Sequence, residues 1–122
     1  MLKLKTKWFN KWAKKNSIGD KVLSDTFQNI SNNLGIVDLG AGLYKVRTAT
    51  SGRGKSGSYR TIVVFRESDI AIFIYGFSKT EKDNLSREEL KNFKKLAKNL
   101  LSIDKQEYNR MIKLGEFISI RE

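Results

Sequence analysis

The sequence predicts an α+β fold in which helices come first, antiparallel strands follow and further helices come last. Three observations support this prediction. Apolar residues recur with a helical period before residue 35, three segments between residues 43 and 77 are rich in β-branched and aromatic residues, and helix-capping signals return after Lys79. A chain of 122 residues can bury one core, so we expect a single domain over residues 1–122.

Two helices are expected in the first third of the chain. Residues 7–15 (KWFNKWAKK) place four apolar side chains on one helical face, which we expect to point inward: Trp8, Phe9, Trp12 and Ala13. A basic helix lying on a membrane surface is the alternative, and the shortness of the segment disfavours it. Ser17 with Asp20 predicts the start of a second helix, and Gly35 predicts its end.

Strands are expected in the middle of the chain. Three long ones cover residues 43–50, 59–66 and 70–77, and a short one is expected at residues 36–40. Only three residues, ESD, separate the last two strands, so these two are predicted to form an antiparallel hairpin. The last strand is apolar on both faces, which predicts a central position in the sheet.

The last third of the chain predicts two more helices. Ser86 and Glu89 form an S-x-x-E capping box, and two leucines occupy the hydrophobic staple positions around it, Leu85 and Leu90. A second helix is expected from about Asp104 to a stop at Gly115. The strand-like segment EFISI follows it.

The composition excludes several kinds of chemistry. Cysteine and histidine are absent, which removes disulfides, thiolate nucleophiles, metal sites built on Cys or His, and a Ser-His-Asp triad. We therefore expect no metal and no cofactor. No apolar run approaches the roughly 20 residues that cross a bilayer, and the Lys-rich start lacks the apolar core of a signal peptide. We expect a cytoplasmic protein with no membrane partner.

Positive charge is concentrated in the first half of the sequence. Residues 1–66 contain 13 Lys or Arg and 3 Asp or Glu, whereas residues 67–122 contain 11 and 10. A one-sided positive field attracts polyanions because their condensed counterions are released on binding. Nucleic acid is therefore the predicted partner, ahead of an anionic membrane.

The segment SGRGKSGSYR, residues 51–60, resembles a nucleotide-binding loop because its glycines have the spacing G-x-G-x-x-G. A dinucleotide site or a Walker loop requires a helix after the glycines, and a strand follows here. The first Walker glycine is also replaced by Ala49. A protein kinase would need H-R-D and D-F-G motifs, which are missing. The segment is expected to be a loop between two strands.

This loop and its strands carry a cluster of basic residues with no acidic residue between residues 43 and 60. The cluster contains Lys45, Arg47, Arg53, Lys55 and Arg60. Lys45 and Arg47 lie on one face of their strand because side chains alternate with period 2, and the loop is expected to return the others nearby. A solvated basic face without chemistry is the alternative.

A basic cluster of this kind can cleave RNA as well as bind it. Attack by the 2′-OH needs a base, an acid for the leaving 5′-oxygen, and positive charge beside the pentavalent phosphate. Lys45 or Lys55 can act as the acid or base where histidine is absent. Tyr59 and Tyr75 can stack on bases or hold a proton. Tyr75 can equally be an ordinary core residue.

Several motifs, in order, resemble the RelE/HigB-type toxins of bacterial type II toxin–antitoxin systems. They are LGAGLYKVR, GRGKSGSYRTIVVFR and IYGFSKTEKDN, followed by EL in the capped helix. The likeness is greatest to the RelE-like subgroup with the signature G-K-S-G-G-Y-R. The resemblance implies helices packed on an antiparallel sheet. It also implies a metal-independent mRNA endoribonuclease (mRNA interferase) acting in the ribosomal decoding site to inhibit translation, and a cognate antitoxin protein that neutralises it.

The resemblance assigns catalytic roles to five basic residues: Lys45, Arg47, Lys55, Arg60 and Lys79. Arg53 joins Tyr59 and Tyr75 as a predicted RNA-binding residue. The chain departs from the family where an arginine after the last lysine is replaced by Thr80, and where a later tyrosine has no counterpart. Ser58 replaces the second glycine of the signature.

Two other functions stay open at this point. One is a nucleic-acid-binding module without catalysis, and the other is a toxin of the related ParE type, which inhibits gyrase on the same fold. A nuclease requires the basic residues to converge around one phosphate, whereas a binding module tolerates a wider spread.

Overall fold

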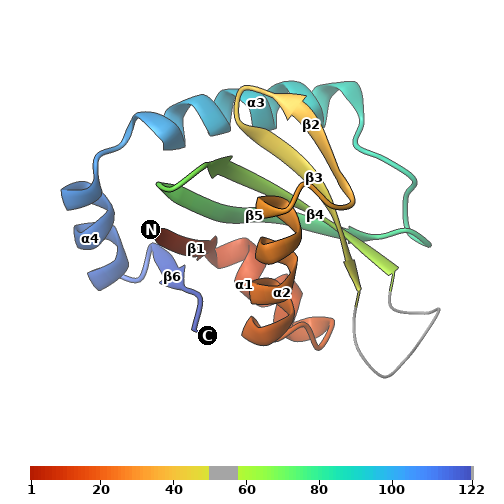
Figure 1. The fold of residues 1–122 in the computed structure, drawn as a ribbon, viewed down its shortest axis with the longest axis horizontal. Coiled ribbons are helices and arrows are strands. Elements are labelled where there is room, and N and C mark those ends of the chain that lie inside the picture. Colours follow the sequence, from red (N-terminus) through yellow and green to blue (C-terminus); the bar gives the residue numbers. More distant parts are fainter. Residues whose placement is uncertain (50–57, 122) are drawn as a thin grey trace.

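The structure is a computed structural model that describes residues 1–49 and 58–121 (Figure 1). The elements are, in chain order, β1 (Leu2–Thr6), α1 (Lys7–Lys15), α2 (Asp20–Ser31), β2 (Ile36–Gly40), β3 (Leu43–Ala49), β4 (Ser58–Arg66), β5 (Ile70–Ser78), α3 (Arg87–Ser102), α4 (Lys105–Lys113) and β6 (Phe117–Ser119). The predicted α+β class is confirmed.

The six strands of the described residues belong to one sheet, in the order β2-β3-β4-β5-β1-β6. β1 runs parallel to β5, and every other neighbouring pair is antiparallel. The predicted hairpin of β4 and β5 is confirmed, and so is the central position of β5. Neighbours on both sides and buried side chains on both faces explain why its sequence is apolar throughout.

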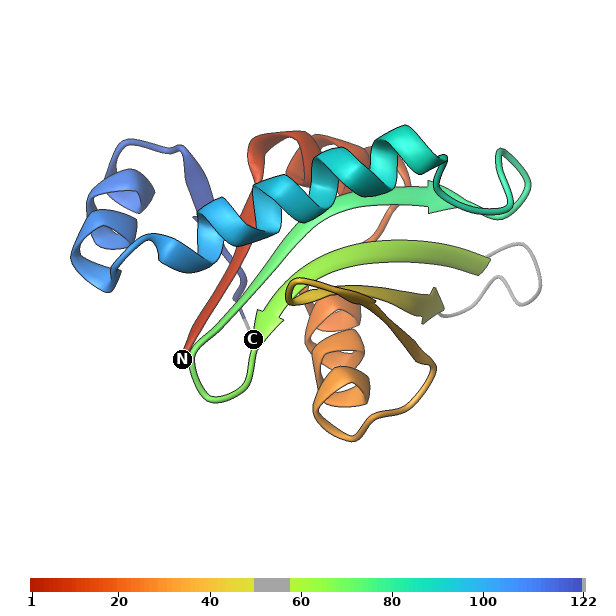
Figure 2. The same cartoon turned by 90° about the horizontal axis from the view of Figure 1, so that it is seen from above.

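Helices cover both faces of the sheet (Figure 2). Phe9 and Ala13 of α1 and Leu23, Phe27 and Ile30 of α2 form one buried cluster against one face. On the other face, residues of α3, α4 and β6 form a second cluster with a different set of strand residues, which includes Leu43, Ile62, Val64 and Ile72. We call the side of the sheet covered by α1 and α2 the α2 face, and the opposite side, covered by α3, the α3 face. Neighbouring strand residues such as Val63 and Val64 join different clusters because side chains alternate along a strand.

The predicted capping signals form as expected at both C-terminal helices. The Ser86 hydroxyl accepts a hydrogen bond from Glu89 N, and the Glu89 carboxylate accepts one from Ser86 N, which completes the capping box of α3. The Asp104 carboxylate accepts from Glu107 N and caps α4. Local signals of this kind depend on residues three positions apart, so they can be recognised in the sequence.

The predicted start of α2 at Ser17 is wrong. Ser17 has a left-handed φ of 58°, and the N-cap is Gly19. The helix also ends at Ser31, before the predicted Gly35. The first residue of the helix, Asp20, instead binds other parts of the chain. Its carboxylate accepts hydrogen bonds from Lys5 Nζ and Arg121 N, each at 2.7 Å.

Strand β1 was not expected from the sequence. Its signal is the alternation of Leu2 and Leu4 with Lys3 and Lys5, which is short and precedes a clear helical pattern. Leu4 is buried in the α3-face cluster. Lys5 is only 8% exposed and is paired with Asp20. The strand therefore fills the position between β5 and β6.

The inward orientation predicted for the aromatic residues of α1 holds for one of the three and fails for another. Phe9 is fully buried, Trp12 is half-buried and Trp8 is 49% exposed. Trp12 covers β5 at Gly76, where a Cβ atom would lie 2.3 Å from the indole ring. Trp8 stacks on Tyr75, with ring centroids 4.8 Å apart.

Candidate functional site

The register of β3, β4 and β5 places the predicted basic residues of β3 and β4 in two neighbouring rows on the α3 face. Lys45 lies opposite Ile62, which lies opposite Tyr75. Arg47 lies opposite Arg60, which lies opposite Phe77. Directly opposite residues have Cβ atoms roughly 5 Å apart, so these side chains share one small area of the sheet. We call Lys45, Arg47 and Arg60 the basic cluster.

A β-bulge at Ile74 determines which face Tyr75 occupies. Val63 pairs with Phe73, but the preceding residue, Ile62, pairs with Tyr75, so β5 contains one extra residue. Simple alternation would place Tyr75 on the same face as Phe73, which packs in the α2-face cluster. The extra residue moves Tyr75 and Phe77 onto the α3 face beside the basic cluster.

The basic cluster is accessible on the α3 face. Arg47 is exposed, and Lys45 and Arg60 are half-buried. Lys45 Nζ donates a hydrogen bond to Asn84 Oδ1 at 3.1 Å, which connects β3 to the segment between β5 and α3. Arg60 Nη1 donates to the carbonyl of Tyr59 at 3.4 Å. Three positive charges therefore lie on one open area of the sheet, where a phosphate can reach them.

A fourth cation, Lys82, lies over β5 in the same region. Its Nζ is 2.7 Å from both carboxylate oxygens of Glu89 and 3.5 Å from the hydroxyl of Tyr75. It also lies 5.5 Å and 5.7 Å from the ring centroids of Tyr75 and Phe77, respectively. The hydrogen bond with Glu89 raises the pKa of Lys82, and the same bond lowers the pKa of Glu89. Both groups are therefore charged near neutral pH.

Sequence reasoning selected Lys79, whose predicted role stays a prediction, and did not consider Lys82. Lys79 follows β5 directly and is exposed. The only available signal for Lys82 was its place in the polar segment that leads into the capping box, seven residues before Glu89.

The two predicted RNA-binding tyrosines lie on opposite faces of the sheet. Tyr75 joins the basic cluster and donates a hydrogen bond to Glu89 Oε2 at 3.4 Å. Tyr59 lies opposite Thr48 and Ser78 and packs against the α2-face cluster. Its ring meets Trp12 edge-on, with centroids 5.6 Å apart. Tyr59 is therefore separated from the basic cluster by the sheet.

Arg53 and Lys55 lie in the segment 50–57, outside the described residues. Their predicted roles stay predictions.

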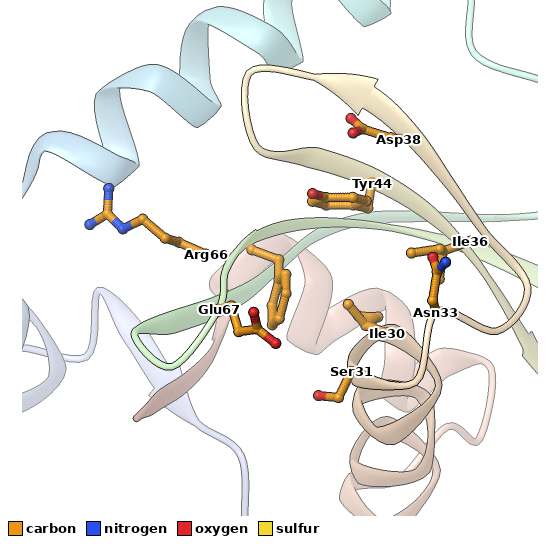
Figure 3. Close-up of a pocket in the computed structure, with 9 residues that line it drawn as sticks. Ile30, Ser31, Asn33, Ile36, Asp38, Tyr44, Arg66 and Glu67 are labelled. Carbon is orange, nitrogen blue, oxygen red and sulfur yellow. The ribbon is translucent and has the colours of Figure 1, made fainter.

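A cavity of about 640 Å³ opens elsewhere, on the α2 face at the end of α2 (Figure 3). Tyr44 and Phe65 line it together with residues of α2 and β2. Tyr44 precedes Lys45 and points to the opposite face of the sheet. The guanidinium of Arg66 is directed away from the cavity, where it donates to the carbonyl of Leu101. The cavity is therefore separate from the basic cluster.

Helix α3 carries a second basic surface. It was not apparent in the sequence because the net charge of residues 67–122 is close to zero. Four lysines line a shallow groove with Ala41, namely Lys91, Lys94, Lys95 and Lys98. Most acidic residues of the second half lie in other elements, so a near-zero sum conceals a positive helix. Positive charge is therefore present on both halves of the chain.

Residues 1–49 and 58–121 contain no group of three or more His, Cys, Asp or Glu side chains that could hold a metal ion. Within the same residues, no helix is sufficiently long and apolar to cross a bilayer.

A protein-family model described as the RelE toxin of the RelE/RelB toxin–antitoxin system matches residues 1–120. The chain belongs to the RelE toxin family. No curated protein matches the sequence. Membership of this family makes the protein the toxin of a toxin–antitoxin system and implies a cognate antitoxin as its partner. The basic cluster lies within the matched residues.

Proposed function

We propose that this RelE-family toxin is an mRNA endoribonuclease (mRNA interferase) that acts on ribosome-bound mRNA in the cytoplasm and thereby inhibits translation. The observation that carries this proposal is the convergence of Lys45, Arg47 and Arg60 on one accessible area of the α3 face. Three cations within reach of one phosphate match the needs of phosphoryl transfer better than charge spread over a surface.

The proposed reaction needs no metal and no cofactor. The 2′-oxygen of one nucleotide attacks the adjacent phosphorus as its proton passes to a base, which forms a 2′,3′-cyclic phosphate. The bond to the 5′-oxygen breaks, and this oxygen takes a proton from an acid. Arg47 and Arg60 stabilise the negative charge that grows on the phosphate oxygens in between. Lys45 and Lys55 are the candidates for the proton transfers.

Tyr75 gives the proposed site an aromatic surface beside its charges. Its ring lies in the row of Lys45. The indole of Trp8, which is 49% exposed, stacks on this ring with centroids 4.8 Å apart, and the ring of Phe93 lies tilted to it with centroids 5.1 Å apart. An unpaired base next to the scissile phosphate can pack against such an aromatic group. Single-stranded RNA, whose bases are unstacked, is the substrate class that uses both features.

The decisive experiment is primer extension on a defined mRNA in a translation extract, with and without ribosomes. We expect new 5′ ends only when protein and ribosomes are both present. Cleavage of naked mRNA would contradict the ribosome requirement. Intact mRNA together with arrested growth of cells that express the protein would overturn the nuclease and favour a gyrase inhibitor or a non-catalytic binding module.

A further inference from the structure

Several contacts define the position of Lys82. Both oxygens of Glu89, the hydroxyl of Tyr75 and the rings of Tyr75 and Phe77 surround its ammonium group. A lysine side chain loses much rotamer entropy when its position is fixed, and these contacts together oppose that loss. The side chain nevertheless stays 30% exposed, which leaves it accessible to a ligand.

We propose that Lys82 is a fourth phosphate-binding residue of the site and that Glu89 is the residue that positions it. The ligand class is single-stranded RNA, bound through a backbone phosphate next to the one held by the basic cluster. The role in cleavage rests on the proposed function, whereas the role in RNA binding can be measured without it.

The position of Lys82 relative to the basic cluster supports this assignment. Lys82 contacts Tyr75 and Phe77, which end the two rows that also contain the basic cluster. Neighbouring strands are about 4.8 Å apart, so side chains on β3 and β5 of one row are separated by roughly 10 Å across the sheet. The backbone of a single RNA strand follows a line of positive charge, so one strand can contact both places.

Glu89 acts on Lys82 from a fixed position. As the third residue of α3, its backbone and carboxylate take part in the capping box with Ser86. Its oxygens accept hydrogen bonds from Lys82, Ser86 N and Tyr75. An ammonium group has three donors, and Glu89 and Tyr75 engage all three. Lys82 contacts a phosphate by exchanging its long 3.5 Å bond to the Tyr75 hydroxyl, while Glu89 still holds it. The carboxylate itself is fully engaged, and therefore we assign it no proton transfer.

One substitution separates the two roles of Glu89, which are to complete the capping box of α3 and to hold Lys82. Glutamine also completes a capping box at the third helical position, so Glu89→Gln keeps the cap and removes only the negative charge that holds Lys82. Lys82→Met removes the cation, and Lys82→Arg keeps a positive charge that can still pair with a carboxylate. Lys113→Met, at the end of α4, removes one charge on the opposite side of the molecule from the segment between β5 and α3, and it serves as the control (Figure 1).

The binding test uses a short 2′-O-methyl RNA, which has no free 2′-OH and cannot be cleaved. Each phosphate contact contributes roughly 0.7 to the slope of log Kd against log salt for single strands. We expect Lys82→Met to reduce this slope by about 0.7, with no change for Lys82→Arg or Lys113→Met. An unchanged slope and affinity for Lys82→Met would overturn the proposal.

The cleavage test measures kcat and KM separately on ribosome-bound mRNA. We expect Glu89→Gln to lower kcat about tenfold, the effect of losing one charge-assisted contact, while KM stays equal or falls because a negative charge near the RNA is gone. A fall in kcat that tracks a fall in melting temperature would reduce Glu89 to a structural residue. If Arg60→Ala loses cleavage and Lys82→Met does not, this inference fails and the proposed nuclease stands. If the unmodified protein does not cleave, the nuclease fails and the salt slope still decides the role of Lys82.

Discussion

Arg60 lies directly opposite Arg47 on the neighbouring strand. Like charges in this arrangement repel each other and weaken strand pairing. Neither residue belongs to the buried core, although fully buried residues flank both of them, Val46 and Thr48 beside Arg47 and Thr61 beside Arg60. An anion bound between the two arginines would relieve their repulsion.

Arg60→Ala is expected to abolish toxicity and to reduce mRNA cleavage by about 100-fold or more, the usual effect of losing a charge that stabilises a transition state. The unfolding free energy should change by less than about 1 kcal/mol, because the lost contacts are offset by relief of the repulsion with Arg47. Growth assays, primer extension and thermal melting measure these effects. Retained cleavage would remove Arg60 from the mechanism.

Tyr108 is almost completely buried in the α3-face cluster, at 1% exposure. Its hydroxyl donates a hydrogen bond to the carbonyl of Leu100 at 2.5 Å, near the end of α3. Burial raises the pKa of Tyr108 from 10.0 to about 12. A helix-end carbonyl needs such a partner when it is buried. This one bond therefore joins α4 to α3.

Tyr108→Phe is expected to lower the unfolding free energy by about 1–2 kcal/mol, because the carbonyl of Leu100 loses its partner. Since the pKa of Tyr108 is raised by folding, its contribution is complete below pH 10 and is lost as the pH rises towards 12. The wild-type protein should therefore lose stability over this range more steeply than the variant. Urea unfolding at several pH values measures this, with Tyr44→Phe as the control. Parallel curves would contradict it.

The ion pair between Lys5 and Asp20 joins three segments that are distant in the sequence. Lys5 lies in β1, Asp20 begins α2, and the carboxylate of Asp20 also accepts from Arg121 N beyond β6. Burial acts to raise the pKa of Asp20, but the hydrogen bonds from Lys5 and Arg121 outweigh it and lower the pKa below the ordinary 3.8. The negative charge of Asp20 therefore stabilises the folded state.

Asp20→Asn is expected to lower the unfolding free energy at neutral pH by about 2 kcal/mol, because Lys5 stays buried without its counter-charge. The contribution of Asp20 is fully present above 3.8 and is lost as the pH falls through its lowered folded pKa. The wild-type and variant curves should therefore converge in acid. Chemical unfolding between neutral and strongly acidic pH tests this, with exposed Asp25→Asn as the control. A difference that stays constant with pH would contradict it.

Elements that depend on neighbours in the sequence were predicted well. The capping box of α3 and the hairpin of β4 and β5 arise from residues a few positions apart. The strand β1 was missed because its partner β5 lies far along the chain, although its alternation was visible. The start of α2 was misplaced because contacts of Asp20 with Lys5 and Arg121 decide it.

The part of the candidate site that depends on local patterns in the sequence was predicted, and the part that depends on distant contacts was not. Alternation along β3 places Lys45 and Arg47 on one face, and pairing with β4 adds Arg60. Tyr75 reaches this face only through the bulge at Ile74, and a bulge cannot be recognised in an uninterrupted apolar strand. The position of Lys82 depends on its contacts with Tyr75 in β5 and Glu89 in α3. These contacts cannot be inferred from the spacing of residues along the sequence.

Over the whole molecule, aromatic residues pack on both faces of the sheet, and the basic cluster lies on only one of them. The α3 face has a buried end beneath α3 and an accessible end with the basic cluster. Helix α3 adds its own lysines to a net charge of +11. Repulsion among so many like charges opposes the folded state.

The melting temperature is expected to rise when NaCl is increased from about 50 to about 500 mM, because the Debye length falls well below 10 Å and the repulsion is screened. Differential scanning calorimetry measures the effect. A double variant, Lys91→Glu with Lys98→Glu, carries less positive charge and should show a smaller rise. A melting temperature that falls with NaCl would show that favourable ion pairs, rather than repulsion, dominate.

The parallel pairing of β1 with β5, completed by β6, also affects the order in which the molecule assembles during synthesis. Leu4 pairs with Ile72 on one side and with Ser119 on the other. Translation adds about 5–20 residues per second, so the first strand waits several seconds for its partners to emerge. Such distant pairing also makes folding slow. Until β6 has left the ribosome, a nascent chain keeps one edge of β1 open.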